Sequence, residues 1–244
     1  EAISMKKIIA LLLSLIMIFS FASCGKDDAA DTDVKDDVSK DSSLEVTGVG
    51  ATAKVTLKDD NRGTGTMANK AQVPTFTVYG DSAAINAIND RINSELVSLL
   101  EAAAAEPLQY AVAITKVVES NQYLQAITSY GNALSLDGLT VSTYIYDKVN
   151  DKEATLEDAL NACGYTESSL KVFIDGLFNE KGPGGDLIKQ KVLGFAFTES
   201  GYPQFFVKVT FDTGADEQSE LITVVPETNT LDQTNADGSV FVVD

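Results

Sequence analysis

Residues 81–106 read DSAAINAINDRINSELVSLLEAAAAE, the clearest helical pattern in the chain. Its large apolar residues recur at spacings of three and four, which places them on one face of a helix and leaves the polar residues on the other. Asp81 is expected to cap the amino end of this helix, and Pro107 to end it. A helix with a single apolar face needs a second layer to cover it. The residues of that face are Ile85, Ile88, Ile92, Leu96, Leu99 and Leu100.

The covering layer is predicted to be β-structure. Residues 110–118 and 122–130 are expected to form a hairpin with its turn near Ser120. Residues 139–146 alternate apolar and polar side chains, which is typical of a half-buried antiparallel strand. Further strands are expected at residues 46–57, 75–79, 191–198, 205–211, 221–225 and 239–243, the last one after a turn at residues 235–238.

Two shorter helices are predicted at about residues 155–181. Thr155 is a suitable cap for a helix over residues 156–163, and Thr166 is a suitable cap for a second helix that ends at the glycine-rich residues 182–185. The chain is therefore assigned to the α+β class, with one or more antiparallel sheets packed against the long amphipathic helix and the two shorter helices. The second helix has as its inward face Leu170, Phe173, Ile174, Leu177 and Phe178.

The amino-terminal region is predicted to be a lipoprotein signal peptide spanning residues 5–23. Lys6 and Lys7 follow the expected start at Met5, and the next 14 residues are apolar except for two serines, whereas a membrane span takes about 20. The sequence FASC at residues 21–24 resembles a bacterial lipobox. This resemblance implies that Cys24 carries lipid and anchors the chain to the outer face of the bacterial cytoplasmic membrane. Residues 24–43 are predicted to form a disordered acidic tether.

The composition is strongly acidic and lacks histidine. Asp and Glu number 36 against 18 Lys and Arg, a net charge of −18, so the chain is not expected to bind nucleic acid through bulk charge. Because there is no histidine, histidine-based triads and imidazole-ligated zinc or haem are excluded. We therefore predict no enzymatic activity, no cofactor and no metal, and keep a hydrolase that works through carboxylates as an alternative.

Several short motifs resemble a known family. They are INAINDRIN at residues 85–93, TYIYD at 143–147, NDK at 150–152 and ATLEDAL at 154–160. Together they resemble the exported accessory domains of PdaC-type peptidoglycan deacetylases and RsiV-type anti-sigma factors, without the catalytic or anti-sigma parts. The resemblance implies a first module over residues 44–107, a second over 108–244, and a Gram-positive host. YGNA at residues 130–133 departs from the Gly-Gly-Ala-His type stretch that is usual in the second module.

These features predict a non-enzymatic, lipid-anchored domain that binds a cell-wall component or a basic protein such as lysozyme, the ligand of the RsiV-type relatives. A carboxylate-based cell-wall glycan hydrolase and a structural or assembly lipoprotein are the alternatives.

Cys163 has no cysteine partner once Cys24 is lipidated, and its apolar neighbours indicate a buried residue. Flat rings stack on sugars, so a candidate ligand face is formed by Tyr123, Tyr130, Tyr144 and Tyr146.

Overall fold

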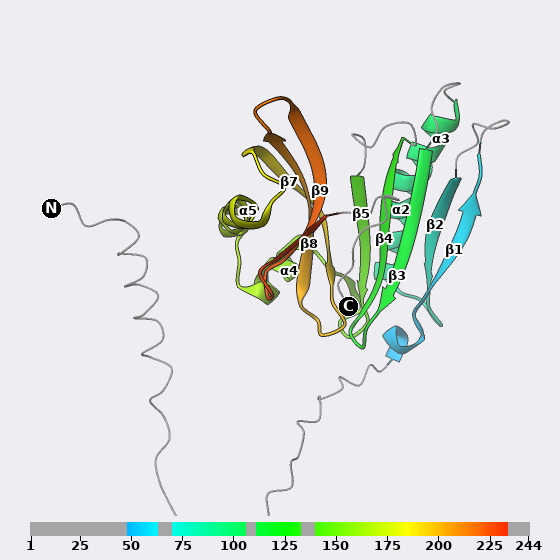
Figure 1. Ribbon diagram of the computed structural model, residues 1–244. Coiled ribbons are helices and arrows are strands. Elements are labelled where there is room, and N and C mark those ends of the chain that lie inside the picture. Colours follow the sequence, from blue (N-terminus) through cyan, green and yellow to red (C-terminus); the bar gives the residue numbers. More distant parts are fainter. Residues whose placement is uncertain (1–47, 63–69, 106–110, 133–139, 234–244) are drawn as a thin grey trace, which may run out of the picture. The chain divides into compact units, whose positions relative to one another are not determined.

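The computed structural model describes residues 48–62, 70–105, 111–132 and 140–233 (Figure 1). The described part of the chain after residue 42 forms one compact unit. The predicted signal peptide, the tether with Cys24, the helix terminator Pro107, and the last turn and strand at residues 235–243 all lie outside the described residues.

The first sheet has six strands in chain order and is mixed rather than purely antiparallel. Its strands are β1 (Lys54–Asp60), β2 (Lys70–Thr77), β3 (Ala111–Glu119), β4 (Tyr123–Asn132), β5 (Thr140–Asp147) and β6 (Lys152–Glu153). All neighbouring strands of this sheet pair in the antiparallel direction except β2 and β3, which form a short parallel pairing. The long helix connects these two strands, and a crossover helix returns the chain in the same direction. Strands from both sides of residue 107 therefore belong to the same sheet.

The second sheet is antiparallel and has the order β10-β9-β8-β7. Its strands are β7 (Asp186–Phe197), β8 (Pro203–Asp212), β9 (Glu217–Val225) and β10 (Thr230–Gln233). β7 and β9 begin earlier than the sequence predicted, and β10 was not predicted. The strand β7 lies at the edge of the sheet and is interrupted by two irregularities, between Leu187 and Lys189 and between Val192 and Gly194.

The long helix consists of α2 (Ala83–Ile92), a π-helical turn η4 (Asn93–Val97) and α3 (Ser98–Ala105). Ser82 rather than Asp81 caps it, because the Ser82 hydroxyl accepts a hydrogen bond from the Ile85 N–H at 3.2 Å. The π turn explains how apolar residues spaced four apart all face the sheet. In a regular α-helix each step of four residues turns the side chain about 40° further around the helix, away from the sheet. The wider π turn brings the following apolar residues back to the face that packs on the sheet.

The two shorter helices confirm the sequence prediction. Helix α4 (Leu156–Cys163) begins at Thr155 and α5 (Glu167–Lys181) begins at Thr166, each with a complete capping box. The predicted strand at residues 46–57 is wrong in its first part, where the chain forms a 3-10 turn, η2 (Gly48–Thr52), before β1. In this turn Gly50 packs directly against the backbone of Lys148, which leaves no room for a side chain.

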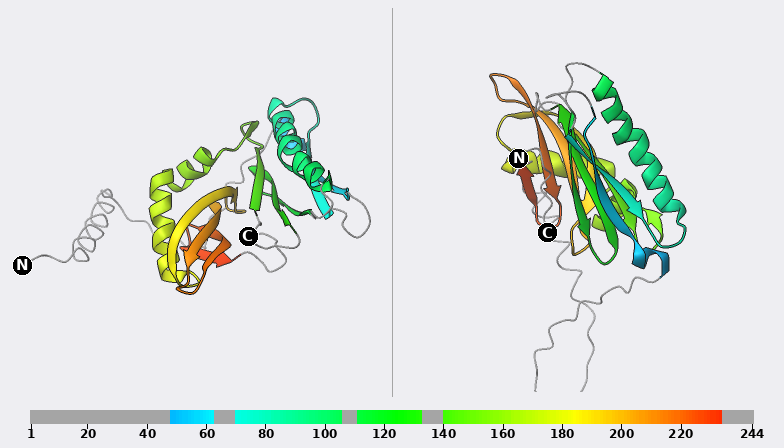
Figure 2. Two further views of the ribbon diagram at one scale, coloured as in Figure 1. Left: turned by 90° about the horizontal axis from the view of Figure 1, so that it is seen from above. Right: turned by 90° about the vertical axis from the view of Figure 1, so that its right-hand side faces the viewer.

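The elements stack in four layers (Figure 2). The long helix covers one face of the first sheet, where Ile88, Ile92 and Phe76 are buried. The opposite face of that sheet packs on the second sheet through Ile127 and Phe206, among others. Helices α4 and α5 cover the outer face of the second sheet. The strand β5 is therefore buried on both faces along most of its length, not on one face as the alternation of its side chains predicted.

Candidate functional site

The four tyrosines that were predicted to form a ligand face do not lie on a common exposed surface. Tyr144 and Tyr146 are completely buried under the long helix, and Tyr123 lies on the other side of the sheet, stacked on Phe197 with 3.9 Å between the ring centroids. Only Tyr130 is partly exposed, and it lines a groove. Alternating strand residues face opposite sides of a sheet, and the pairing of β4 with β5 places Tyr123 on the side opposite to the other three tyrosines. The four rings therefore cannot share one surface.

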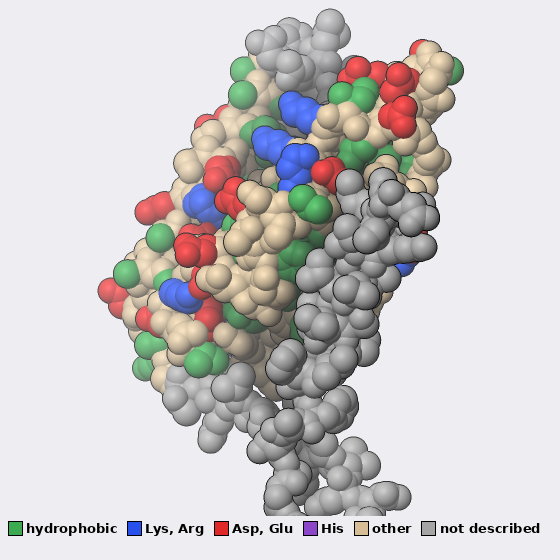
Figure 3. All heavy atoms as spheres, turned by 90° about the vertical axis from the view of Figure 1, so that its left-hand side faces the viewer, with side chains coloured by type: hydrophobic (Ala, Val, Ile, Leu, Met, Phe, Trp, Pro, Cys, Tyr) green, Lys and Arg blue, Asp and Glu red, His purple; other side chains and the backbone are tan. Residues whose placement is uncertain are grey.

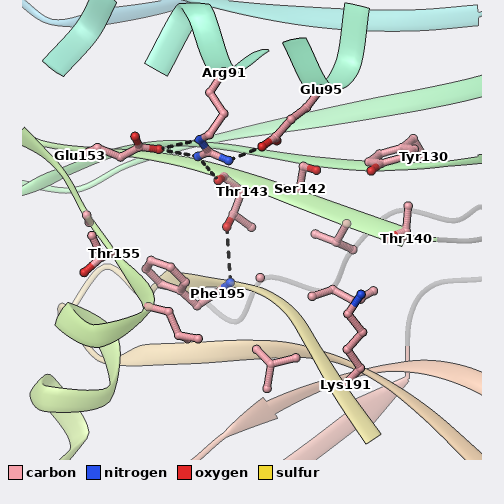
Figure 4. A pocket seen from close by; sticks show the side chains of 16 residues that line it. Arg91, Glu95, Tyr130, Thr140, Ser142, Thr143, Glu153, Thr155, Lys191 and Phe195 are labelled. Carbon is pink, nitrogen blue, oxygen red and sulfur yellow. Dashed lines mark hydrogen bonds and ion pairs between the residues drawn. The ribbon is translucent and has the colours of Figure 1, made fainter. Parts of the chain in front are cut away.

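The groove lies between β5, most of which extends beyond the two-residue edge strand β6 of the first sheet, and β7, at the edge of the second (Figure 4). It encloses about 520 Å³, within the range of small-ligand sites. Hydroxyl groups, four charged side chains and a few apolar residues make up its walls. They belong to Arg91, Glu95, Tyr130, Thr140, Val141, Ser142, Thr143, Glu153, Ala154, Thr155, Leu156, Lys191, Val192, Leu193, Gly194 and Phe195.

Within the groove its two strands approach closely at one point. A Cβ atom on Gly194 would lie 2.9 Å from the Thr143 side chain, so a larger residue there would have to displace that side chain. The Phe195 N–H also donates to the Thr143 hydroxyl at 3.4 Å. From this contact β5 and β7 diverge, and no described strand pairs with β5 between Thr140 and Ile145 on the groove side.

Arg91 forms the centre of the polar wall. Its guanidinium donates to the Glu153 carboxylate through two nitrogens, at 2.9 and 2.5 Å, and to the Glu95 carboxylate at 3.2 Å. It also donates to the Thr143 carbonyl at 2.8 Å and lies 4.5 Å from the centre of the Tyr144 ring. Burial, and then the nearby Glu95 carboxylate, raise the pKa of Tyr144 well above its ordinary value of 10. The network fixes helix α2 to β5 and the segment after it.

The arrangement is suited to binding a polar ligand. Glu95 and Glu153 flank one guanidinium (Figure 4), so both carboxylates already serve as ion-pair partners. Lys191 is different, because it is exposed and forms no ion pair with any residue that the structure describes. Its side chain extends from β7 toward the part of β5 that carries Thr140 (Figure 4). The groove thus offers a cation that no described residue neutralises, together with several hydroxyl groups.

A smaller cavity of about 260 Å³ adjoins the groove on the side of α4 and α5. The two share Leu156 and Val192, and the smaller one is mainly apolar, with Leu160, Leu170 and Ile174 in its walls.

Lysine and arginine side chains gather in one region of the face seen in Figure 3, although acidic residues outnumber basic ones two to one in the whole chain.

The remaining candidate residues add no chemistry to the groove. Cys163 is half-buried at the end of α4, its thiol donates to the carbonyl groups of Ala159 and Leu160, and burial raises its pKa. Within the described ranges, no group of three or more cysteine and acidic side chains is placed to hold a metal ion. The same ranges contain no helix with the length and apolar character that a membrane span requires.

Apart from Tyr130, the groove residues were not identified as a site from the sequence. In the sequence, Arg91 is one of several charged residues on the polar side of a predicted helix, and Lys191 is one charged residue in a predicted strand. Neither position indicates a site. The only local signal was Gly194 within a strand, because an isolated glycine there indicates a close approach of another backbone. The groove depends on how two sheets meet, which periodicity along the chain does not encode.

No protein-family model matches the chain, and no curated protein matches it. Among solved structures, the chain is similar to the crystal structure of a DUF3298 family protein from Pseudomonas aeruginosa, with a TM-score of 0.39 and 12% identity over 81% of this chain and 99% of that one.

Proposed function

We propose that this protein is a non-enzymatic, extracytoplasmic binding domain, anchored through lipid on Cys24, and that it binds a cell-wall component in the groove between β5 and β7. The observation that carries the proposal is the groove itself. It is open, has a volume suited to a small polar ligand, and combines hydroxyl groups with Lys191, which forms no ion pair with the described residues. Peptidoglycan fragments carry hydroxyl, amide and carboxylate groups, which match these walls. The lipobox and the motifs that resemble PdaC-type and RsiV-type accessory domains support the same location and role.

The proposal is tested by titrating the purified full chain with soluble disaccharide-peptide fragments of peptidoglycan in a calorimeter. Ser142 lines the groove and is partly exposed, so Ser142→Trp should fill the cavity and weaken binding at least tenfold. Thr56→Trp on the exposed strand β1 is the matched control and should bind as the unmodified chain does. Equal binding by both variants would show that the groove is not the site.

The hydrolase alternative makes a different prediction for the same groove. Glu95 and Glu153 would have to supply a general acid and a second carboxylate, yet Arg91 lies between them and pairs with both. We expect no new reducing ends when the chain is incubated with peptidoglycan. Release of reducing ends that disappears in Glu153→Gln would refute the non-enzymatic proposal.

A second candidate ligand is a basic protein such as lysozyme, which the net charge of −18 favours through electrostatic steering. Biolayer interferometry against lysozyme, with cytochrome c as an equally basic control, separates a shaped site from bulk charge. Binding to lysozyme alone that persists between about 0.15 and 0.5 M salt would support this candidate, because screening differs strongly between these concentrations. Binding to both proteins that disappears at the higher salt would count against it.

A further inference from the structure

Strand β5 presents an incomplete set of backbone hydrogen bonds to the groove. The Thr143 carbonyl accepts from Arg91 at 2.8 Å, and the Ile145 carbonyl accepts from the Ala154 N–H at 2.9 Å. In an antiparallel strand the groups that face one side belong to every second residue. The N–H and carbonyl of Val141 and the N–H of Thr143 therefore face the groove as well, where no described strand pairs with them.

The opposite wall of the groove does not offer such a template. One irregularity of β7, between Val192 and Gly194, lies in the segment that borders the groove, a second lies just before that segment, and Lys189 and Lys191 lie between the two. Bulges and lysines on an edge strand oppose pairing with another strand. An incoming chain would therefore pair with β5, while β7 would supply side chains, Lys191 among them.

The remaining features define what would bind. Arg91 already occupies the Thr143 carbonyl and the Ala154 N–H occupies the Ile145 carbonyl, so the free edge of β5 runs only from Thr140 to the N–H of Thr143. Four strand residues span about 13 Å, which limits a paired ligand to three or four residues. Near Thr140 the Lys191 side chain has no carboxylate partner among the described residues, and its charge is complementary to a carboxylate.

We propose that the ligand of the groove is a short extended peptide with a free carboxylate, which adds to the edge of β5 through its backbone and places its carboxylate at Lys191. Addition of a strand to an open sheet edge is a general mode of peptide recognition. This inference rests on the proposed function and narrows it, because it assigns recognition to the peptide part of a cell-wall fragment rather than to its sugars.

The test uses three probes in calorimetric titrations of the full chain: N-acetyl-trialanine with a free carboxylate, its carboxyl-terminal amide, and the acid methylated on its middle amide nitrogen. We expect the acid to bind at least tenfold more tightly than either of the others, since the amide lacks the charge and the methylated peptide lacks a backbone donor. Lys191→Gln should abolish the preference for the acid. Lys54→Gln, an exposed lysine on the distant strand β1, should retain it.

The outcomes that contradict the inference are distinct from those that contradict the proposed function. Equal binding of the three peptides, or a preference for the acid that persists in Lys191→Gln, overturns peptide pairing at β5. Binding of peptide-free glycan strands but of no peptide, weakened by Ser142→Trp, overturns the inference and leaves the groove as a cell-wall site. If neither peptides nor glycan strands nor disaccharide-peptides bind, both proposals fail.

Discussion

Gly50 shows how a single residue can join distant segments of the chain. It lies in the turn before β1, and a Cβ atom built on it would lie 1.9 Å from the carbonyl oxygen of Lys148. Gly50→Ala must push two backbone segments apart, which should lower the free energy of unfolding by about 1–3 kcal/mol. Chemical denaturation followed by circular dichroism measures this change.

Gly176 provides the matched control for that substitution. It lies on the exposed side of α5, and a Cβ atom there would have no atom within 4 Å. Gly176→Ala should therefore stabilise the protein by about 0.5–1 kcal/mol, because alanine loses less conformational freedom in a helix than glycine does. If both variants change stability in the same direction, the tight packing at Gly50 is not as described.

The buried tyrosines predict how stability depends on pH. Burial, more than any other cause, raises the pKa of Tyr123 and of Tyr146 from 10.0 to about 12. Between pH 10 and 12 the unfolded chain loses these protons while the folded chain keeps them, so the free energy of unfolding should fall as the pH rises through this range. Guanidinium denaturation at pH 8, 10 and 11 checks this expectation.

Tyr123→Phe isolates one contribution to that fall. Phenylalanine keeps the stacking on Phe197 but cannot ionise, so the variant should lose less stability between pH 10 and 11 than the unmodified chain. An unchanged slope would contradict the assignment to Tyr123.

The capping residues Thr155 and Thr166 were predictable from the sequence, because a cap acts within one turn of its own helix. The burial of the tyrosines was not predictable, because it depends on which layers cover the sheet.

Among the secondary-structure elements, the long helix gives the sharpest prediction. If its π turn accommodates one extra residue, deleting the exposed Ser94 should convert the turn to regular α-helix and leave Leu96 and Leu100 on the sheet. The change in melting temperature should be small. Deleting the exposed Ala87 is the control, because it rotates Ile85 away from the face of Ile88 by about 100° and should prevent folding. Equal damage from both deletions would contradict this account of the π turn.

Elements were predictable where periodicity and turn residues agree. The hairpin of β3 and β4, the helices α4 and α5, and the apolar face of the long helix all follow from such patterns. The first part of β7 was missed because it is mostly exposed and has little alternation to detect. The parallel pairing of β2 with β3 was missed because it follows from the path of the crossover helix.

At the scale of the whole molecule, Gln125 joins the two sheets. Its side-chain amide is completely buried, accepts from the Phe197 N–H and donates to the Phe197 carbonyl, both at 2.7 Å. Gln125→Leu would leave two buried backbone groups without partners, which should cost about 2–6 kcal/mol of unfolding free energy, since each such group costs roughly 1–3 kcal/mol. Thermal and chemical denaturation measure the loss.

The control for this substitution is Gln218→Leu on the exposed part of β9, which should change stability by less than about 0.5 kcal/mol. A loss in Gln125→Leu no larger than in the control would mean that the sheets are held together without this amide. The same junction of two sheets creates the groove, which explains why no motif in the sequence predicted Arg91 and Lys191 as neighbours of one site.

Hydrogen exchange with mass spectrometry shows whether the ligand binds in the groove between β5 and β7. The full chain is exchanged with and without soluble disaccharide-peptide fragments of peptidoglycan. We predict slower exchange in residues 140–143 of β5 and 191–195 of β7, and unchanged exchange in β1. Unchanged exchange along β5 and β7, or protection confined to other surfaces, would contradict binding in the groove.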